Sequence, residues 1–512
     1  MVGTGYTGRI LVDTPQGMMQ TTNRLQDWYT QQNRRTHAIL VGLLLGIIGG
    51  LIGLLLAVAG PVITIGAVIG TLAALYILTD VSAALYGLIA VAVLLPFGTL
   101  PFKVVITPTL LDMAAGAFVL VYLFQWMTGR RHRLVLTPIH ALILIYVIWL
   151  VLSFALGLRF APPTPNKLRQ FAETLLSISL AFILVDLVRD IATLRRIVTV
   201  FVLLVGIQAV VTIVLYVLPD DLTERMLVRL ARIGYPNGGV IRYIEDNPAL
   251  AERAIGTWVD PNALGGALAV SATLIAAQVF TPKPLLRWRW LTVCLFFTVG
   301  LALLLTFSRA SMLALAGGLF LMGMLRYRRY LPVLIFAGLA LLVLPQTQIF
   351  VERFIQAFTG ADLATQMRLG EYTDSLRLIS QYPVFGVGFT GTPSIALYTD
   401  VASMYLIMAN QIGMVGLALF LVMIVGIFAF GLHAWPRAKQ NPALEAIHLG
   451  LHAAILALLV NAVADLYFFR LDFQASISLM WLVIGLALAT SRLALNQPLP
   501  NDAASSKMSR QN

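Results

Sequence analysis

Residues 197–217 of this chain read IVTVFVLLVGIQAVVTIVLYV and contain no charged side chain. A helix that crosses the hydrocarbon core of a bilayer needs about 20 mainly apolar residues, because in lipid a helix satisfies its own backbone groups. This stretch therefore predicts a transmembrane helix.

The whole chain has the same character. Of its 512 residues 59% are hydrophobic and 11% are charged, and the mean hydropathy is +0.87. Soluble domains carry about 25% charged residues, and a soluble surface needs more polar cover than this composition supplies. The single cysteine, Cys294, has no disulfide partner. The composition indicates a membrane protein and excludes a disordered chain, a collagen-like fibre and a disulfide scaffold.

The hydropathy pattern predicts an all-α, polytopic integral membrane protein with about fourteen transmembrane helices. A count of twelve or thirteen is possible, because the short third stretch could form a re-entrant pair with the second. The predicted spans are 38–58, 61–79, 81–95, 109–127, 138–156, 170–188, 196–217, 258–280, 289–306, 309–325, 330–346, 403–433, 446–468 and 474–493.

The orientation follows from Lys and Arg, which accumulate on the cytoplasmic side of a membrane protein. With both termini inside, the cytoplasmic segments carry 21 of the 35 basic residues and 7 of the 23 acids, a net charge of +14, and the outer segments carry −2. The basic excess of the chain is thus a topology signal and predicts no nucleic-acid partner.

These spans divide the chain into seven predicted segments. They are a cytoplasmic tail (1–37), N-terminal transmembrane helices (38–217), an extracytoplasmic loop with an interfacial helix (218–257), further transmembrane helices (258–346), a long extracytoplasmic loop acting as a lid (347–402), C-terminal transmembrane helices (403–494) and a disordered cytoplasmic tail (495–512).

Both long loops are too apolar for disorder and too long for simple turns. In the first, Asp221 to Ile233 has one apolar helical face, which is typical of a helix lying in the membrane interface. In the second, Leu363 to Gln381 is predicted to be helical. Gly386 and Gly388 follow it and predict a tight turn where a backbone could approach a ligand.

The second loop also carries regularly spaced charges. Arg368, Glu371, Asp374 and Arg377 are separated by three residues, so neighbouring pairs can form ion pairs on a helix. Because the rotation accumulates, Arg368 and Arg377 are expected on opposite sides of an unbroken helix.

Two further segments place arginine at an outer membrane boundary. Arg253 precedes Gly256 and then Asp260-Pro261-Asn262, a sequence that predicts a helix start with Asp260 as its N-cap. Arg309 follows Ser308 at the junction of two spans. Arginine beside a helix N-terminus is a natural anion site, although a structural ion pair with an outer carboxylate is the alternative for each arginine.

In their order, these motifs resemble the O-antigen ligase and O-antigen polymerase family over roughly residues 250–430. The shared features are Arg-x-x-Gly before Pro-Asn, Thr-x-Ser-Arg-Ala at a span boundary, and a long loop with Arg-x-x-x-Tyr and Pro-x-x-Gly-x-Gly. A span with Gln-x-Gly-x-x-Gly-Leu (Gln411 to Leu417) then follows. The spacing from Arg377 to Gly388 also resembles the Arg-x10-Gly pattern of the polymerase branch.

The resemblance implies a glycosyltransferase that works without metal or cofactor at the outer face of the cytoplasmic membrane. Its partners would be a polyprenyl diphosphate-linked oligosaccharide, an acceptor glycan or glycolipid, and the lipid bilayer. The departing diphosphate needs cations, for which arginine is suited because its planar fork binds phosphate oxygens in pairs. The expected diphosphate-binding residues are Arg253, Arg309, Arg368 and Arg377, and the site-shaping residues are Gly256, Pro261, Asn262, Ser308, Gly386 and Gly388.

One departure from the family pattern concerns the base. In the ligase branch a His-Asn pair begins the helix after the long loop, whereas Ala402 and Ser403 stand at those places here. All six histidines are predicted at or near the cytoplasmic side. The base is therefore expected to be a carboxylate, with Asp400 as the nearest candidate and Glu371 and Asp374 as others. This departure favours a polymerase over a ligase.

Other interpretations stay open at this point. Fourteen spans would also suit a polysaccharide or lipid transporter or flippase, and a scaffold without chemistry is a third class. The pair His448 and His452 has zinc-binding spacing without an evident third ligand, so packing is the simpler interpretation. Asn461 and Asp465 could line the same outer cavity or bond a neighbouring helix.

Overall fold

The computed structural model describes residues 34–100, 107–131, 133–332, 335–336, 363–391 and 401–497. This part is 75% helix and 2% strand, which confirms the all-α class. Eight of its helices are long and apolar enough to cross a membrane, and further apolar helices are shorter. The chain is a multi-pass membrane protein, while the count of fourteen spans and their orientation stay predictions.

The chain divides into two compact units, residues 1–76 and 77–512. The described part of the first unit is helix α2 (Arg34–Thr79), whose last residues belong to the second. Gly60 interrupts α2 with a φ of 79°, and Pro61, which has no N–H, follows it. The break falls where the sequence separates the spans 38–58 and 61–79.

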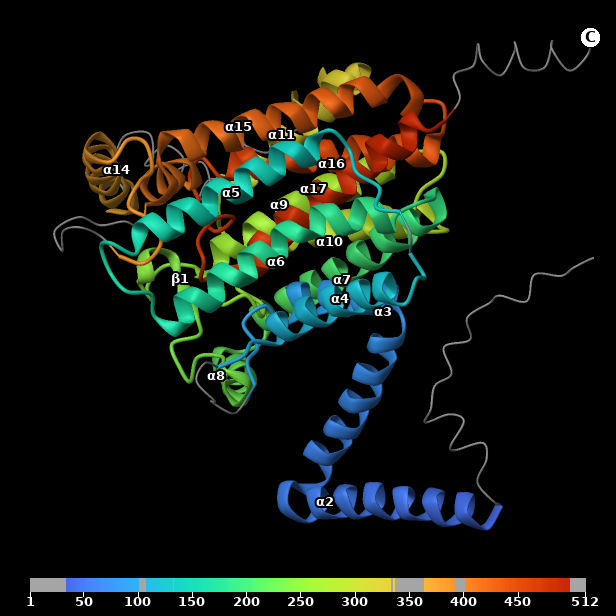
Figure 1. The fold of residues 1–512 in the computed structure, drawn as a ribbon. Coiled ribbons are helices and arrows are strands. Elements are labelled where there is room, and N and C mark those ends of the chain that lie inside the picture. The colour runs from blue at the N-terminus through green and yellow to red at the C-terminus, as the bar shows by residue number, and fades with distance from the viewer. Residues whose placement is uncertain are drawn as a thin grey trace, which may run out of the picture. The chain divides into compact units, whose positions relative to one another are not determined.

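The second unit holds the remaining described elements (Figure 1). They are α3 (Val81–Leu94), α4 (Leu110–Met127), α5 (Ile139–Gly157), α6 (Pro165–Leu187), α7 (Ile191–Val217), α8 (Asp220–Arg229), the 3-10 turns Leu230–Ile233, Ile244–Asp246 and Arg328–Tyr330, β1 (Arg242–Tyr243), β2 (Glu252–Arg253), α9 (Pro261–Val279), α10 (Arg289–Leu305), α11 (Arg309–Leu325), α14 (Leu363–Gln381), α15 (Met404–Ala438), α16 (Pro442–Asn461) and α17 (Gln474–Leu495).

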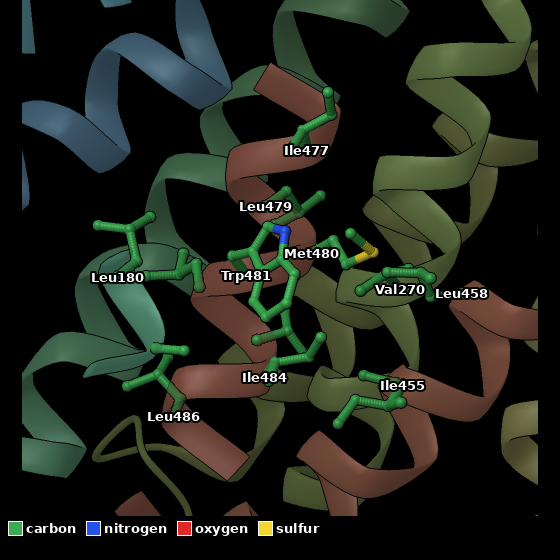
Figure 2. Close-up of a cluster of buried hydrophobic side chains, with 14 of the residues drawn as sticks. Leu180, Val270, Ile455, Leu458, Ile477, Leu479, Met480, Trp481, Ile484 and Leu486 are labelled. Atoms are coloured by element: carbon green, nitrogen blue, oxygen red, sulfur yellow. The ribbon is translucent and has the colours of Figure 1, made fainter. Parts of the chain in front are cut away.

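Helix α17 forms the core of this unit. It packs against α6, α15 and α16, and α9 in turn packs against α16, α11 and α10. Figure 2 shows Trp481, Met480 and Ile484 of α17 among side chains of neighbouring helices, and all three are at most 2% exposed. A helix that is apolar on every side must be buried on every side or face lipid, and α17 is enclosed by protein.

The outer helices show the opposite arrangement. Ile148 on α5, Val210 on α7, Phe297 on α10 and Val425 on α15 expose between 51% and 66% of their surface. These apolar surfaces are the faces that a bilayer would cover.

The predicted spans from 81 to 325 and from 403 to 493 each coincide with a helix, but one boundary is wrong. The span 446–468 ends early, because α16 stops at Asn461 and residues 462–473 form turns. Leu466 and Phe468 are buried by protein in this turn segment. Their apolar character therefore does not indicate a stretch that crosses lipid. The predicted span 330–346 lies largely outside the described residues.

Loops predicted to be cytoplasmic lie together at one end of the bundle. Arg131 pairs with Asp186 at 2.8 Å, Arg195 donates to the Pro284 carbonyl at 2.7 Å, and Arg326 lies 2.7 Å from Glu445. Helix α14 and strand β1 lie at the other end, which we call the α14 end (Figure 1).

The predicted interfacial helix is shorter than expected. Helix α8 ends at Arg229, and a 3-10 turn continues to Ile233. Leu227 is buried against Leu215, Val240 and Ile255, while Leu222 is 43% exposed. Its placement in a membrane interface stays a prediction.

A break in α15 explains the two glycine motifs. Gly413 has a φ of 73°, and the carbonyls just before it are exposed to donors from elsewhere. The backbone N–H of Val387 donates to Asn410 at 2.8 Å, and that of Gly388 donates to Gln411 at 2.9 Å. The turn and the broken helix therefore hold each other.

These glycines allow other segments of the chain to approach the turn closely. A Cβ on Gly386 would lie 2.5 Å from the Asn410 carbonyl oxygen, and one on Gly388 would lie 2.5 Å from the Gly157 Cα. Both have positive φ, 67° and 76°. The two glycines thus pack the turn against α15 and α5, while the approach of a ligand to this turn stays a prediction.

We expect Gly388→Ala to lower the free energy of unfolding by about 2–5 kcal/mol, because it combines backbone strain with an overlap in a packed contact. Thermal unfolding in detergent measures the change. The control is Gly370→Ala on α14, where a Cβ would meet nothing within 4 Å and the helix should gain up to about 1 kcal/mol. Equal melting temperatures for Gly388→Ala and wild type would contradict the packing role.

Candidate functional site

Helix α9 begins as the sequence predicts. Asp260 is its N-cap and accepts hydrogen bonds from the backbone N–H groups of Asn262 at 2.8 Å and Ala263 at 2.9 Å, and Pro261 is the first helical residue. The Asp260 carboxylate already occupies these donors. The helix end therefore does not offer the open anion site that the sequence suggested, and the arginines are the remaining anion ligands.

Arg253 joins three elements at the α14 end. It lies on β2, which pairs with β1, and its Nε donates to the Thr306 carbonyl at 2.9 Å. An Nη of the same guanidinium donates to Asn262 Oδ1 at 2.5 Å. The described residues thus use two of its five N–H donors.

The electrostatics around Arg253 are mixed. Burial lowers the pKa of its guanidinium, Asp260 and Asp465 raise it, and the positive charge of Arg309 lowers it. Two guanidinium groups therefore lie within electrostatic range of each other. An anion between them would relieve that repulsion.

Arg309 is the first residue of α11, after the N-cap Ser308. Ser308 Oγ lies 2.8 Å from Ser311 Oγ, and Asn461 Nδ2 donates to Ser311 Oγ at 3.0 Å. Helix α16 is thereby tied to the start of α11, as one interpretation of Asn461 predicts.

Two residues beside these helix starts have unusual backbone conformations. Val259 precedes Asp260 with a φ of 61°, and Phe307 precedes Ser308 with a φ of 52°. Positive φ is unfavourable for both types, most of all for a β-branched residue. Such strain concentrates at functional sites.

Gly256 shapes the loop between Arg253 and α9. It has a φ of 52°, and a Cβ there would lie 2.5 Å from Gln208 Nε2 and from Thr212 Oγ1 of α7. The loop can lie this close to α7 because the residue has no side chain.

A buried carboxylate lies among the arginines. Asp465 follows α16, is 2% exposed, and accepts a hydrogen bond from Asn461 Nδ2 at 3.2 Å. Burial raises the pKa of Asp465 to about 7, although Arg368 and Arg253 act in the opposite direction. Tyr467 follows two residues on, and burial, with the nearby charges of Asp260 and Asp465, raises the pKa of its phenol well above its usual range.

Helix α14 supplies Arg368 to this group and clamps the segment where the ligase branch has histidine. Ala402 N–H donates to Glu371 Oε2 at 3.0 Å, and Tyr372 OH donates to the Ala402 carbonyl at 3.3 Å. Met404 N–H donates to the Asp465 carbonyl at 2.9 Å. Asp465 therefore lies beside the place that histidine leaves vacant.

We call the set of Arg253, Asp260, Arg309, Arg368 and Asp465 the arginine centre. Arg368 and Arg253 both act on Asp465, and Arg309 acts on Arg253, so residues far apart in sequence meet here. The side chains come from β2, the N-termini of α9 and α11, α14 and the turn after α16.

The structure does not bring every candidate to this centre. Arg377 is 61% exposed and pairs with Asp374 at 3.5 Å, so it turns away from the side of α14 that carries Arg368, as its spacing predicts. Glu371 accepts a hydrogen bond from the backbone N–H of Ala402. Asp400 lies outside the described residues.

The sequence only partly identified this set. Asn461 and Asp465, polar residues four apart near the end of a span, are predicted either to line the same outer cavity or to bond a neighbouring helix, but not to be catalytic. Nothing in the sequence distinguishes Tyr467 from the aromatic residues that follow it. Among the described residues no group of three metal-ligating side chains occurs, and His448 and His452 contact the carbonyls of Gly431 and His448.

The fold and this centre define a multi-pass membrane protein with an arginine-rich, partly buried polar site at one end of its helical bundle. Residues 294–421 match the family model described as O-antigen ligase, which confirms the resemblance drawn from the motifs. The match includes Arg309, Arg368 and the broken start of α15, and leaves Arg253 and Asp465 outside it. A sequence comparison with curated proteins gave no match.

Proposed function

We propose that this protein is a polysaccharide polymerase of the O-antigen ligase type. It would transfer glycan from a polyprenyl diphosphate-linked donor to a sugar hydroxyl at the outer face of the cytoplasmic membrane. The observation that carries the proposal lies at the end of the bundle opposite the basic loops. There Arg253 is held against Thr306 and Asn262, Arg253 and Arg368 both act on the buried Asp465, and Arg309 acts on Arg253.

In the proposed reaction the arginine centre holds the leaving group. The acceptor oxygen forms a bond to the anomeric carbon, and the bond from that carbon to the phosphate oxygen breaks. The electron pair leaves with the lipid diphosphate, and Arg253, Arg309 and Arg368 stabilise its charge. Arg377 has no part in this proposal, because its exposed side chain pairs with Asp374.

The proposal assigns the proton of the acceptor hydroxyl to Asp465. A general base works best when its pKa lies near the working pH, and the buried Asp465 has a pKa of about 7. Its position beside Ala402 supports the assignment, because the ligase branch carries its histidine there. Asp400 and Asp374 stay alternatives suggested by the sequence, whereas Glu371 accepts the Ala402 N–H.

The absence of histidine from residues 402 and 403 favours a polymerase over a ligase. Under the predicted orientation the arginine centre faces outward, where glycans assembled on a lipid carrier are joined. A transporter would bind its cargo near the middle of the membrane in interrupted helices, whereas the arginine centre lies at helix ends.

Reconstitution into liposomes tests the proposal. The purified protein should lengthen prenyl-linked oligosaccharides, extracted from the producing cells, without added nucleotide, as gel electrophoresis of the glycans would show. Protein-free liposomes are the control. Movement of the lipid-linked sugar across the bilayer without a new glycosidic bond would instead establish the transporter class and overturn the proposal.

A further inference from the structure

A second polar site lies at the α14 end, outside the arginine centre. A hollow of about 450 Å³ is lined by residues from the α3–α4 connection, the start of α6, the loop after α8 and the turn before α17. Small-ligand sites occupy about 300–1,000 Å³. Val259, which precedes Asp260, is part of the lining and makes the hollow adjoin the arginine centre.

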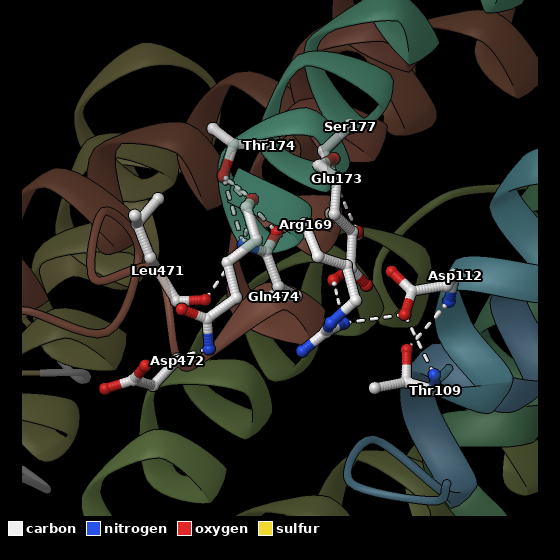
Figure 3. Close-up of polar contacts among 11 residues, drawn as sticks. Thr109, Asp112, Arg169, Glu173, Thr174, Ser177, Leu471, Asp472 and Gln474 are labelled. Carbon is white, nitrogen blue, oxygen red and sulfur yellow. Dashed lines mark hydrogen bonds and ion pairs between the residues drawn. The ribbon is translucent and has the colours of Figure 1, made fainter. Parts of the chain in front are cut away.

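Charged residues on one side of the hollow are fixed by several contacts (Figure 3). Arg169 lies 2.6 Å from Asp112 Oδ2 and 3.1 Å from Glu173 Oε2. Asp112 also forms a capping box with Thr109 at the start of α4. The Arg169 guanidinium therefore has its orientation set before any ligand arrives.

Some polar atoms of this side are without partners. Glu173 is 2% exposed and its carboxyl group adjoins that of Asp112, yet Glu173 Oε1 accepts no hydrogen bond from the described residues. Arg169 Nε is likewise buried and donates none within that part of the chain. Arg169 and Glu173 thus keep hydrogen-bonding capacity that the described residues do not use.

The charged groups of the site pair with one another among the described residues. The acids Asp112, Glu173 and Asp472 are matched by Arg169 and by Lys167 and Arg470, which lie 3.8 and 3.3 Å from Asp472. Within this part of the chain the hollow differs from the arginine centre in having no excess of positive charge for a phosphate or a carboxylate ligand. A neutral ligand with many hydroxyl groups suits it best.

Aromatic rings connect the hollow to the arginine centre. Phe97 lines the hollow, and its ring lies 5.6 Å from that of Phe473. The Phe473 ring lies 4.5 Å from that of Tyr467, whose phenol is within electrostatic range of Asp260. Aromatic faces with a few placed polar groups are the usual lining of a small-molecule site.

We propose that the hollow bounded by Phe97, Arg169, Glu173 and Asn237 binds a neutral sugar unit of the glycan, next to the reacting centre. This inference rests on the proposed function, which supplies the glycan. The sugar belongs either to the lipid-linked donor or to the acceptor chain, and both present the same hydroxyl chemistry.

Cysteine protection tests the site without requiring catalysis. In a Cys294→Ser background, Asn237→Cys places a thiol on the exposed rim of the hollow. The probes are the prenyl-linked oligosaccharide of the producing cells, the same oligosaccharide released from its lipid by mild acid, and bare polyprenyl diphosphate. We expect the prenyl-linked oligosaccharide to slow maleimide labelling at least fivefold, the released oligosaccharide to do the same if the site holds the acceptor sugar, and the bare lipid to leave labelling unchanged.

Two variants connect this protection to the hollow. Glu173→Gln should raise the oligosaccharide concentration that gives half-maximal protection at least tenfold. Gln170→Ala, on the rim of the hollow, should raise it about threefold. One informative variant therefore remains if the other misfolds. Glu224→Gln on the exposed surface of α8 is the matched control and should change nothing. If protection requires the lipid-linked form, the sugar is that of the donor, and if the released oligosaccharide suffices, it is that of the acceptor.

Failure of the inference differs from failure of the proposed function. Chain growth in liposomes with no protection by either sugar probe, or equal protection by bare polyprenyl diphosphate, would overturn the sugar site alone. Protection that Glu173→Gln weakens, without any chain growth by wild type, would support the sugar site and overturn the polymerase.

Discussion

Arg309→Ala is expected to reduce glycan transfer by about 100-fold to 1,000-fold while the protein keeps its level in the membrane. Removing one preorganised donor to a developing negative charge costs about 2.7–4 kcal/mol in other enzymes. Arg309 lies close enough to Arg253 to lower the pKa of that guanidinium, and a departing diphosphate would hold the two cations together. The initial rate of chain growth in liposomes measures the effect.

Two further variants separate charge from shape at this position. Arg309→Lys should recover part of the rate, because lysine keeps the charge but loses the forked contact with phosphate oxygens. Arg225→Ala, which removes an exposed arginine of α8, should stay within twofold of wild type. Undiminished chain growth in Arg309→Ala would remove Arg309 from the proposed mechanism.

Asp465→Asn is expected to lower transfer about 100-fold and to abolish its dependence on pH near neutrality. Asp465 must lose its proton to act as a base, and its pKa is raised to about 7 by burial. The wild-type rate should therefore rise as the pH passes through about 7 and then level off. Rates measured from pH 5.5 to 8.5 would show this rise in wild type and a flat profile in the variant.

The same group has the opposite effect on stability. Its pKa in the folded protein, about 7, lies above the ordinary value of 3.8, so the folded state binds the proton more tightly than the unfolded state. This contribution is fully present below about pH 4 and is lost as the pH rises through about 7. Wild type should thus melt at a lower temperature at pH 8 than at pH 5.5, with a smaller difference in Asp465→Asn.

The exposed Asp221 on α8 offers the control for both measurements. Asp221→Asn should keep the wild-type pH profile and melting curve. An Asp465→Asn protein that retains the neutral-pH rise in rate would show that another group takes the proton.

The helical architecture could be predicted because lipid imposes one rule on every span. Apolar stretches of sufficient length must satisfy their own backbone, so the predicted spans from 81 to 325 coincide with α3 to α7 and α9 to α11. Local signals gave the start of α9 at Asp260-Pro261 and both ends of α14, since caps and helical periodicity depend on neighbouring residues. The end of α16 was misplaced because burial in a turn and burial in lipid select the same apolar residues.

The site was only partly predictable. Arginine at a span boundary is costly, which drew attention to Arg253 and Arg309. Arg169 and Glu173, four residues apart in α6, are a second charged pair near a span boundary. Gly386 and Gly388 predict a close approach, and the structure shows that α15 and α5 make it, because a glycine motif indicates that something approaches closely without showing what.

The sequence by itself determined that this is a helical membrane protein, where its helices lie, and that basic residues concentrate in one set of loops. These properties follow from the composition of continuous segments. Only the tertiary structure decided that the turn after α16 places Asp465 close to arginines from β2 and α14, and that Arg309 of α11 lies close to Arg253. Distances between segments hundreds of residues apart depend on helix packing, which the order of residues along one segment does not encode.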